Sequence, residues 1–399
     1  MYKLLVLTST YPRWENDTEP PFVEKLSAGY SDNFIVHVLA PGFPGAKNQE
    51  EKRGITVYRF DSLLNASHKL AYNGGILSNL RKNHFYYLLV PLFLASQIIH
   101  AYKLHKQHHY DLVHAHWIIP QGVAALILKI ISRVKFKILM TSHGGDLYAL
   151  TNRIFKIIKK YLIIKSDHIT VVSNAMKKYC VTLTGEEEKI SVISMGVDLK
   201  TMFVNKIPFY DRKDLIYVGR LVEKKGVRYL IEAFNKLSEK HPDIMLYIVG
   251  DGPERGPLTL LASNNKKIVF IGSVNNNKLP EYYNKAKIAI IPSIVASDGD
   301  QEGLGLTIIE AMGCGCAVIA SDLEAIRDII MPGNTGLLVK EKNPDEIAEA
   351  INYLLENTDA TEKMAGNGQK YVREKFDWGI ICSNYSKLIM EIINNKRIL

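Results

Sequence analysis

Two glutamates that stand eight residues apart, Glu302 and Glu310, are the most informative pair in this chain. Between them lie Gly303 and Gly305, which let backbone N–H groups turn toward a ligand without a Cβ in the way. An apolar helix is predicted to begin near Leu306. A helix N-terminus offers unpaired N–H groups and a positive dipole end, so this segment is suited to bind phosphate.

The two carboxylates would hold the parts of a ligand on either side of that phosphate. Glu310, five residues into the helix, could accept hydrogen bonds from vicinal hydroxyls such as those of a ribose. Glu302 lies ahead of the helix and would reach a different part of the same molecule. A ligand that carries hydroxyls on both sides of a diphosphate fits this arrangement, and a nucleotide sugar is such a ligand. The alternative is a surface helix with a capping acid and a solvated second glutamate.

A loop of this kind needs a sheet to position it, and the chain alternates short apolar runs with longer helical ones. The first half is expected to form strands at 3–8, 35–39, 57–60, 112–115, 138–141, 169–172 and 190–193. The second half is expected to form strands at 215–219, 245–250, 268–271, 288–291, 317–320 and 336–339, with helices at 227–240, 254–263, 279–285, 306–313, 323–330 and 344–356.

Strands that alternate with helices favour parallel sheets built from βαβ units. We therefore expect an α/β protein with two Rossmann-like, doubly wound domains and a cleft between them. The first domain is predicted to span residues 1–205 and the second 206–375. A final helix within 376–399 is expected to pack back on the first domain.

Two further loops of the second half carry fitting chemistry at strand ends. Gly219 ends one predicted strand, and Arg220 and Lys225 follow it, where both cations can face a diphosphate that gains charge as it leaves. After the next strand comes the run Gly250-Asp251-Gly252. Its glycine spacing departs from the dinucleotide fingerprint, so we read it as a backbone turn beside the base or ribose.

In the first half, His143 and Asp146 stand on a glycine-rich loop after a predicted strand. Both could orient sugar hydroxyls, and His143 could also stabilise charge during group transfer. His116 ends another strand, where an acceptor-side role and simple core packing beside Trp117 are both open.

Together these loops resemble the retaining glycosyltransferases of family 4, which have the GT-B fold. The resemblance covers nearly the whole chain, and its motifs include Val218-Gly219-Arg220 with Lys225-Gly226, Val249-Gly250-Asp251-Gly252-Pro253, Phe270-Ile271-Gly272, Pro292-Ser293, Glu302 with Glu310-Ala311-Met312, His143-Gly144-Gly145-Asp146 and Phe376-Asp377-Trp378.

The resemblance implies transfer of a sugar from a nucleotide-diphosphate sugar to a hydroxyl of a glycan or lipid-linked glycan, with retention of configuration. Arg220 and Lys225 would hold the diphosphate, Glu310 the ribose and Glu302 the transferred sugar. The backbone N–H groups of Gly303, Leu304, Gly305 and Leu306 would complete the phosphate site. No metal and no cofactor beyond the donor substrate is expected, because the cations and the helix terminus supply the positive charge.

Two segments depart from the family pattern. Many members carry paired glycines after the first strand, near the donor phosphate and the acceptor, whereas residues 8–22 of this chain contain none. Arg13 and Asn16 are the acceptor-side candidates there. The second is the acidic run 297–301 ahead of Glu302, which resembles a branch of the family associated with cell-surface polysaccharide assembly and so implies a role in cell-surface polysaccharide or glycolipid biosynthesis. Asp298 and Asp300 in this run look like a metal-binding pair, but we do not expect a metal at them.

The charge of the chain is unevenly distributed. Residues 1–205 contain 25 Lys and Arg against 15 Asp and Glu, and residues 206–399 contain 25 against 26. Because basic residues interleave with apolar ones in the first half, an anionic membrane surface is one candidate partner, and ordinary solvated lysines are the alternative. The apolar stretch 85–104 is interrupted by polar residues and is expected to pack on a sheet, and a lipid-facing edge is left open.

No nucleic-acid partner is expected, because no zinc-finger or RNA-binding signature accompanies the charge. The four cysteines are too few for a disulfide framework, and we expect no signal peptide because residues 2–8 read as a short buried strand. We expect a cytoplasmic enzyme, and a peripheral position at the inner face of the membrane is left open. A non-catalytic glycan- or lipid-binding protein on the same scaffold is the main alternative. A phosphorylase is not favoured, because such an enzyme is expected to bind pyridoxal phosphate through a lysine in a longer chain. A dehydrogenase is not favoured, because this chain lacks the glycine spacing of the dinucleotide-binding motif.

Overall fold

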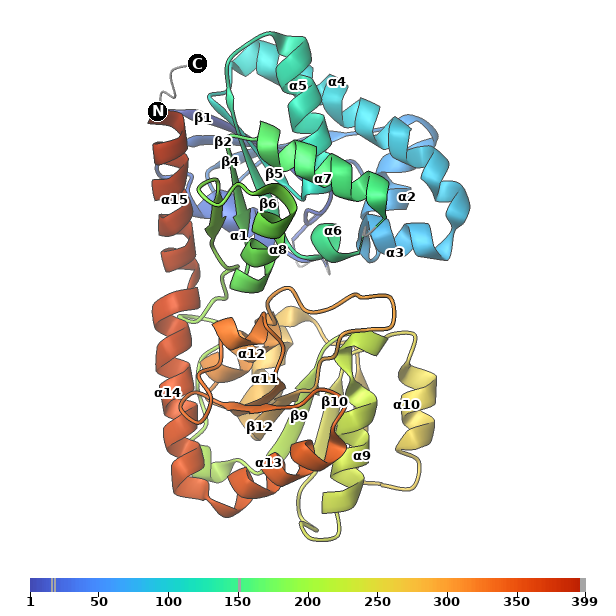
Figure 1. Cartoon of the computed structure of the whole chain (residues 1–399), viewed down its shortest axis with the longest axis vertical. Coiled ribbons are helices and arrows are strands. Elements are labelled where there is room, and N and C mark those ends of the chain that lie inside the picture. Colours follow the sequence, from blue (N-terminus) through green and yellow to red (C-terminus); the bar gives the residue numbers. More distant parts are fainter. Residues whose placement is uncertain (16, 18, 150–151, 395–399) are drawn as a thin grey trace. The chain divides into compact units, whose positions relative to one another are not determined.

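The chain forms two parallel sheets with helices packed around each, as the computed structural model shows (Figure 1). The structure describes all residues except 16, 18, 150–151 and 395–399. It divides into two compact units. Unit 1 contains Met1–Val172, Met176–Ser194 and the chain from Ile381 onward, and unit 2 contains Ser173–Ala175 and Met195–Ile380.

The sheet of unit 1 has eight strands in the order β3-β4-β2-β1-β5-β6-β7-β8. All neighbouring strands are parallel except β3, which pairs antiparallel with β4 at the edge. The strands are β1 Lys3–Leu7, β2 Ile35–Pro41, β3 Gln49–Lys52, β4 Ile55–Phe60, β5 Leu112–His116, β6 Lys137–Ser142, β7 His168–Val171 and β8 Ile190–Val192.

The helical segments of the first part of the chain connect these strands. They are α1 Phe22–Gly29, η1 Leu63–Asn65, α2 Ala66–Ala71, α3 Gly75–Lys82, η2 His84–Leu89, α4 Val90–His108, η3 Ile118–Gly122, α5 Val123–Ser132, α6 Gly145–Tyr148, α7 Arg153–Lys165 and α8 Asn174–Thr184. The last helix, α15 Trp378–Asn394, begins in unit 2 and ends in unit 1.

The sheet of unit 2 has six parallel strands in the order β11-β10-β9-β12-β13-β14. They are β9 Asp214–Val218, β10 Leu246–Val249, β11 Ile268–Gly272, β12 Ala286–Ile291, β13 Ala317–Ser321 and β14 Leu337–Val339. The connecting segments are η4 Phe209–Asp211, η5 Glu223–Lys225, α9 Val227–Leu237, α10 Arg255–Leu261, η6 Asn276–Lys278, α11 Leu279–Lys285, α12 Leu306–Gly313, η7 Ile326–Asp328, α13 Pro344–Glu356 and α14 Thr358–Phe376.

Helix α9 shows why these segments fold as they do. Val227, Leu230, Ile231 and Phe234 follow one another at helical spacing, and all are buried in the core of unit 2. That apolar stripe packs against the sheet, whose strand β13 is buried along its whole length. The burial pattern therefore places helices over a parallel sheet, which confirms the expected α/β class.

The expected helices 279–285, 306–313 and 344–356 have the observed bounds of α11, α12 and α13. The prediction of a helix at 323–330 is wrong, because only the 3-10 turn η7 forms there. Strand β3 and helix α14 were not expected. The stretch 85–104 forms η2 and most of α4, and α4 buries Phe93 and Gln97.

Candidate active site

The strand order of unit 2 reverses between β9 and β12. From β9 the chain proceeds outward to β10 and β11 on one side, and β12 returns to pair with β9 on the other. In open parallel sheets, ligands bind beyond the carboxyl ends of the strands at such a switch point. The loop after β9 carries Arg220 and Lys225, and the loop after β12 carries Glu302.

Lys225 and Glu302 form an ion pair at this point, although 77 residues separate them in sequence. The Nζ of Lys225 lies 2.5 Å from Oε1 of Glu302. Ser293, two residues after β12, donates its hydroxyl to the same oxygen at 3.1 Å. The neighbouring Lys224 pairs with Asp300 at 3.1 Å. The pairs tie the loop after β9 to the loop after β12.

The carboxylate of Glu302 is charged despite its burial. Its residue is only 8% exposed, and burial alone would raise its pKa. The nearby ammonium groups of Lys225 and Lys224, with the hydrogen bonds from Lys225 and Ser293, outweigh burial and hold the pKa of Glu302 below its usual value. The site therefore keeps a buried negative charge that is neutralised by a cation.

The glycines of the β9 and β10 loops allow the two backbones to touch. A Cβ on Gly250, whose φ is +137°, would lie 1.9 Å from the carbonyl oxygen of Gly219. A Cβ on Gly252 would lie 2.2 Å from the carbonyl oxygen of Leu221. The Leu221 N–H donates to the Asp251 carbonyl at 3.0 Å, which holds the loops in this contact. These glycines fix the shape of the loop that carries Arg220.

Helix α12 begins at Leu306 after Gly305, which has a φ of +93°. Leu304 is buried, whereas Gly303 and Leu306 are partly exposed. The helix carries Glu310, which is also partly exposed and accepts a hydrogen bond from the buried Tyr283 hydroxyl at 3.3 Å. The hydroxyl of Tyr283, whose pKa is raised by burial and then by Glu310, remains protonated as the donor.

Arg220 and Asp251 stand at the surface of the same loops. Arg220 is exposed, and among the described residues no ion pair engages its guanidinium. Asp251 is exposed and pairs with Arg255 at 2.7 Å, while also accepting the Gly252 N–H at 2.7 Å. Asp251 thus stabilises its own turn, and Arg220 presents a cation at the end of β9.

The sheet of unit 1 has its own switch point between β1 and β5, because the chain passes from β1 to β2 on one side and returns to β5 on the other. His116 ends β5, and His143 follows β6. The Nδ1 of His116 lies 3.0 Å from the Nε2 of His143. The two rings are nearly coplanar, with an interplanar angle of 9°, so this is an edge-to-edge hydrogen bond.

Burial decides the proton positions in this pair. His116 is fully buried, and its Nε2 has no hydrogen-bond partner among the residues that the structure describes. A buried unpaired N–H is less tolerable than a buried unpaired lone pair, so we assign the His116 proton to Nδ1. His116 then donates to Nε2 of His143, which must carry its own proton on Nδ1. Burial lowers the pKa of His143 and of His116, so both rings are neutral.

Asp146 holds the loop that carries His143. Its Oδ2 accepts the Ile118 N–H at 2.6 Å, and its Oδ1 accepts the Ser142 hydroxyl at 2.8 Å. Burial raises the pKa of Asp146, and these hydrogen bonds and the charge of Lys159 act against that rise. The structure therefore places Asp146 between the β5 and β6 loops, with both oxygens bonded to protein donors.

Arg13 is buried and bound within its own loop. Its guanidinium and backbone N–H contact the Asp17 carboxylate at 2.6 to 2.8 Å. Its guanidinium carbon also lies 4.5 Å or less from the ring centroids of Trp14 and Phe43. These contacts of Arg13 stabilise the conformation of the loop after β1. Asn16 lies outside the described residues.

Sequence reasoning did not single out the partners that orient these side chains. Ser293 was visible only as part of a Pro-Ser motif, and Tyr283 and Asp17 carried no signal. In unit 1, His114 binds the Thr141 hydroxyl at 2.7 Å, and Tyr385 of α15 lies 3.1 Å from the Thr170 hydroxyl. Such links depend on strand pairing and on the packing of a distant helix, neither of which a local motif reveals.

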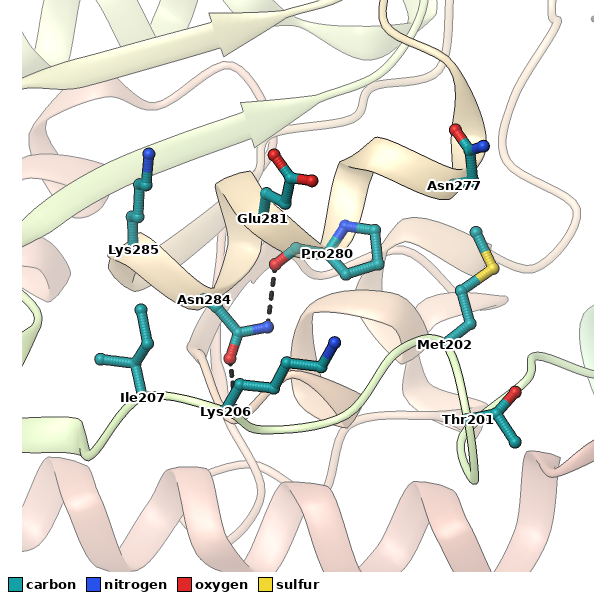
Figure 2. A pocket seen from close by; sticks show the side chains of 9 residues that line it. All are labelled: Thr201, Met202, Lys206, Ile207, Asn277, Pro280, Glu281, Asn284 and Lys285. Carbon is teal, nitrogen blue, oxygen red and sulfur yellow. Dashed lines mark hydrogen bonds between the residues drawn. The ribbon is translucent and has the colours of Figure 1, made fainter.

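A separate pocket of about 500 Å³ opens beside α11 (Figure 2). None of its lining residues was a predicted site residue, and Figure 2 shows the amide of Asn284 directed to the protein itself. Asn284 accepts the Lys206 N–H at 2.7 Å and donates to the Pro280 carbonyl at 2.8 Å. The pocket is lined by Thr201, Met202, Lys206, Ile207, Asn277, Pro280, Glu281, Asn284 and Lys285.

The acidic pair ahead of Glu302 is engaged with protein groups. Asp300 pairs with Lys224, and Asp298 accepts the Asp300 N–H at 2.9 Å. Within the described part of the chain, His, Cys, Asp and Glu side chains do not gather in groups of three or more that could hold a metal ion.

Two doubly wound parallel-sheet domains, with polar loops at both switch points, are the architecture of the GT-B glycosyltransferases. Sequence models of two families match the chain in succession, Glycosyltransferase Family 4 over residues 22–201 and Glycosyl transferases group 1 over residues 201–371. The chain belongs to this family of group 1, family 4 glycosyltransferases.

Relatives and solved structures agree with that assignment. An uncharacterized glycosyltransferase of Methanocaldococcus jannaschii is 30% identical over 334 residues, which cover 78% of this chain and 84% of that protein. A phosphatidyl-myo-inositol mannosyltransferase of Mycobacterium tuberculosis is 27% identical over 290 residues, 70% of this chain and 73% of that protein.

Among solved structures, sucrose-phosphate synthase from Thermosynechococcus elongatus has a TM-score of 0.77 at 21% identity, covering 98% of this chain and 99% of that one. HepE of Anabaena, solved in complex with UDP and glucose, has a TM-score of 0.71 at 20% identity, covering 98% of this chain and 100% of that one. Both likenesses concern the fold.

Proposed function

We propose that this glycosyltransferase moves a sugar, with retention of configuration and without a metal ion, from a nucleotide-diphosphate sugar to a hydroxyl of a glycan or lipid-linked glycan. The observation that carries the proposal is the Lys225–Glu302 pair at the switch point of unit 2. It places a cation and a buried carboxylate beside each other, next to a loop that presents the exposed Arg220.

Unit 2 would bind the donor. Arg220, Lys225 and the first N–H groups of α12 supply positive charge to the diphosphate, which gains negative charge as it leaves. Glu310 accepts hydrogen bonds from the ribose, and Glu302 accepts them from hydroxyls of the transferred sugar. These residues supply the neutralising charge that a divalent ion would bring in a metal-dependent transferase.

Unit 1 would bind the acceptor. A neutral His143 with its proton on Nδ1 donates a hydrogen bond to a sugar oxygen, and His116 fixes the ring that does so. The acceptor is proposed to be lipid-linked. The mannosyltransferase relative is named for a phospholipid acceptor, and the basic first half of this chain suits a cytoplasmic enzyme that works at the inner face of a membrane.

The test is thermal stabilisation of the full chain by a panel of nucleoside diphosphates and their sugars, in chelator and then with Mg²⁺. We expect a clear rise in Tm with one nucleotide family in chelator, because a ligand that binds only the folded state stabilises it. Stabilisation that requires Mg²⁺ would overturn the metal-free proposal. No stabilisation by any nucleotide would overturn the donor site.

The stereochemistry needs its own measurement. NMR of the first product formed from the identified donor reports the anomeric configuration before it can equilibrate. The same configuration as in the donor is expected, and inversion would contradict the proposed mechanism.

A further inference from the structure

One segment of unit 1 is almost free of acidic residues. Residues 62–166 contain 14 Lys and Arg but only two Asp or Glu, Asp111 and Asp146. Asp146 is buried, and the half-buried Asp111 accepts the Lys3 N–H at 2.7 Å. Among the cations only Lys159 is fully buried. Lys129 and Lys137 pair with Asp167 just beyond the segment, and the other exposed cations give its surface a net positive charge.

The same segment exposes most of the large apolar side chains found at the surface. Of the 22 large hydrophobic residues exposed in the described chain, 13 lie in these 105 residues. Scattered single apolar residues are normal on a protein surface, but a concentration of this kind marks an interaction site. The most exposed are Phe85 at 80%, Leu63 at 76%, Leu88 at 74%, and Leu64 and Ile154 at 69%.

These side chains lie on elements that touch one another. Helix α4 packs against η1 and η2 and against α5, and α5 packs against α7 (Figure 1). On α4 the exposed residues Pro91, Ala95, Ile99 and Tyr102 follow at spacings of four, four and three, which places them on one face of the helix. Lys103 and Lys106 continue the exposed surface toward the C-terminus of α4.

The opposite face of α4 belongs to the domain. Phe93 packs against Phe60, with ring centroids 5.2 Å apart, and the buried Gln97 donates to the Thr8 carbonyl at 3.1 Å. The segment His84–His108 is long and apolar enough to cross a membrane, but these contacts hold it on the sheet. A helix with one face in the domain and an apolar, basic outer face lies along a bilayer.

We propose that the surface formed by η1, η2, α4, α5 and α7, here called the basic apolar face, docks unit 1 on an anionic lipid bilayer. Phe85, Leu88 and Leu63 enter the headgroup region, while Lys103 and Lys106 contact lipid phosphates. Anionic lipid is the occupant that suits both properties of the face, since it offers apolar chains and a negative surface. The inference deepens the proposed function, because it places the acceptor domain at the membrane that holds a lipid-linked acceptor.

The test is flotation of the full-length protein with phosphatidylcholine vesicles, with and without phosphatidylglycerol, at low salt. We expect binding only when phosphatidylglycerol is present, with a decline as salt rises. The double variant Phe85→Ser, Leu88→Ser should reduce the bound fraction on the order of tenfold. The variant Lys103→Glu, Lys106→Glu should do the same.

Matched controls lie in unit 2. Leu260 is 76% exposed on α10, and Leu260→Ser should leave binding unchanged. Lys363 and Lys370 are exposed on α14, so Lys363→Glu, Lys370→Glu makes the same charge change away from the basic apolar face. An equal loss in Lys363→Glu, Lys370→Glu would show that net charge alone matters, and an equal loss in Leu260→Ser would show that the position of the apolar residue does not matter; either result would overturn the surface. Binding to neutral vesicles as tight as to anionic ones would overturn the anionic partner.

Two other outcomes would also overturn the inference. A dimer in solution that Phe85→Ser, Leu88→Ser converts to monomer would make the face a contact between two copies of this chain. Absence of vesicle binding, together with normal stabilisation by a nucleoside diphosphate, would remove the membrane surface and leave the proposed function standing.

The converse result separates the two proposals as well. Vesicle binding without nucleotide stabilisation would confirm the surface and contradict the transferase site.

Discussion

The two switch points of this molecule differ in the charge of their buried ionisable side chains. In unit 2, Glu302 is buried but kept charged, because Lys225 lies 2.5 Å away. In unit 1, burial lowers the pKa of both His116 and His143, so the pair is joined as neutral rings, while the carboxylate of Asp146 is held by hydrogen bonds from Ile118 and Ser142. The same fold therefore builds one site from balanced charges and another from neutral hydrogen-bonding groups.

The difference suits the two halves of the proposed reaction. A diphosphate is recognised by charge, and fixed cations stabilise it most as its charge grows. A sugar acceptor has neutral hydroxyls, which are recognised by oriented donors and acceptors rather than by net charge. Five predictions test whether the contrast between a charged and a neutral site holds.

The largest effect is expected at the charged site. Lys225→Ala removes a cation from the diphosphate and leaves Glu302 buried without its neutralising partner. Turnover should fall by about 10²–10³-fold, as it does when a preorganised electrostatic contact is lost. Lys225→Arg keeps the charge and should retain much more activity. The measurement is steady-state kinetics with the identified donor, and near-normal turnover in Lys225→Ala would contradict the diphosphate role.

The next effect is expected at the neutral site. His116→Ala removes the N–H that fixes His143, and turnover should fall on the order of 10- to 100-fold. His116→Asn places a donor near the position of Nδ1 and should restore part of the loss. A purely structural role for His116 would instead give equal losses in both variants. Nitrogen NMR of histidine-labelled protein should also report the proton of His143 on Nδ1, and a proton on Nε2 would refute the assignment.

The neutral site also predicts a pH profile. Because burial lowers the pKa of His143 to about 3, its ring is neutral across the physiological range. The profile of kcat/KM should therefore show no histidine ionisation between about pH 5 and 8. An ionisation near the ordinary histidine value of about 6.5 would show that His143 is charged in part of this range.

A smaller effect is expected at the ribose contact. Glu310→Ala should weaken donor binding by roughly tenfold, through loss of hydrogen bonds to a charged acceptor. Tyr283→Phe removes only the hydroxyl that lies 3.3 Å from Glu310, so it should change donor affinity by about threefold or less. Titration calorimetry with the nucleoside diphosphate measures both, and unchanged affinity in Glu310→Ala would remove its ribose role.

The smallest effect concerns stability. The folded pKa of Glu302 lies below its unfolded value of about 4.3, so its charged form stabilises the fold above that pH. This contribution is lost as pH falls through the folded pKa. Urea unfolding should therefore find Glu302→Gln less stable than the native chain by on the order of 1 kcal/mol at neutral pH, with a gap that closes in acid. A gap that widened in acid would contradict the lowered pKa.

The sequence predicted the elements whose apolar pattern is strong. The bounds of α12 followed from the glycines before Leu306 and the buried run after it. Strand β3, by contrast, reads Gln-Glu-Glu-Lys and lies at a sheet edge, so it has no apolar alternation. The segment 323–330 has apolar residues at helical spacing, yet only the 3-10 turn η7 forms, so local preference alone is a weak predictor of a helix.

For the candidate site, the sequence predicted which loops carry chemistry but not what each side chain contacts. The Lys225–Glu302 pair and the His116–His143 bond join residues from different loops, so they depend on strand order. Asp146 shows the same limit. A carboxylate after a glycine-rich turn can face a ligand or the backbone, and here it accepts hydrogen bonds from Ile118 and Ser142.

The path of α15 has a consequence for how the protein is made. Unit 1 takes its final helix from the end of the chain, and Tyr385 on that helix lies 3.1 Å from the Thr170 hydroxyl. Nearly all of unit 2 is continuous, from Met195 to Ile380. During synthesis the ribosome therefore releases all of unit 2 before it releases the last piece of unit 1. The domain whose sequence starts first is completed last, and a fragment truncated after Ser194 lacks part of its own fold.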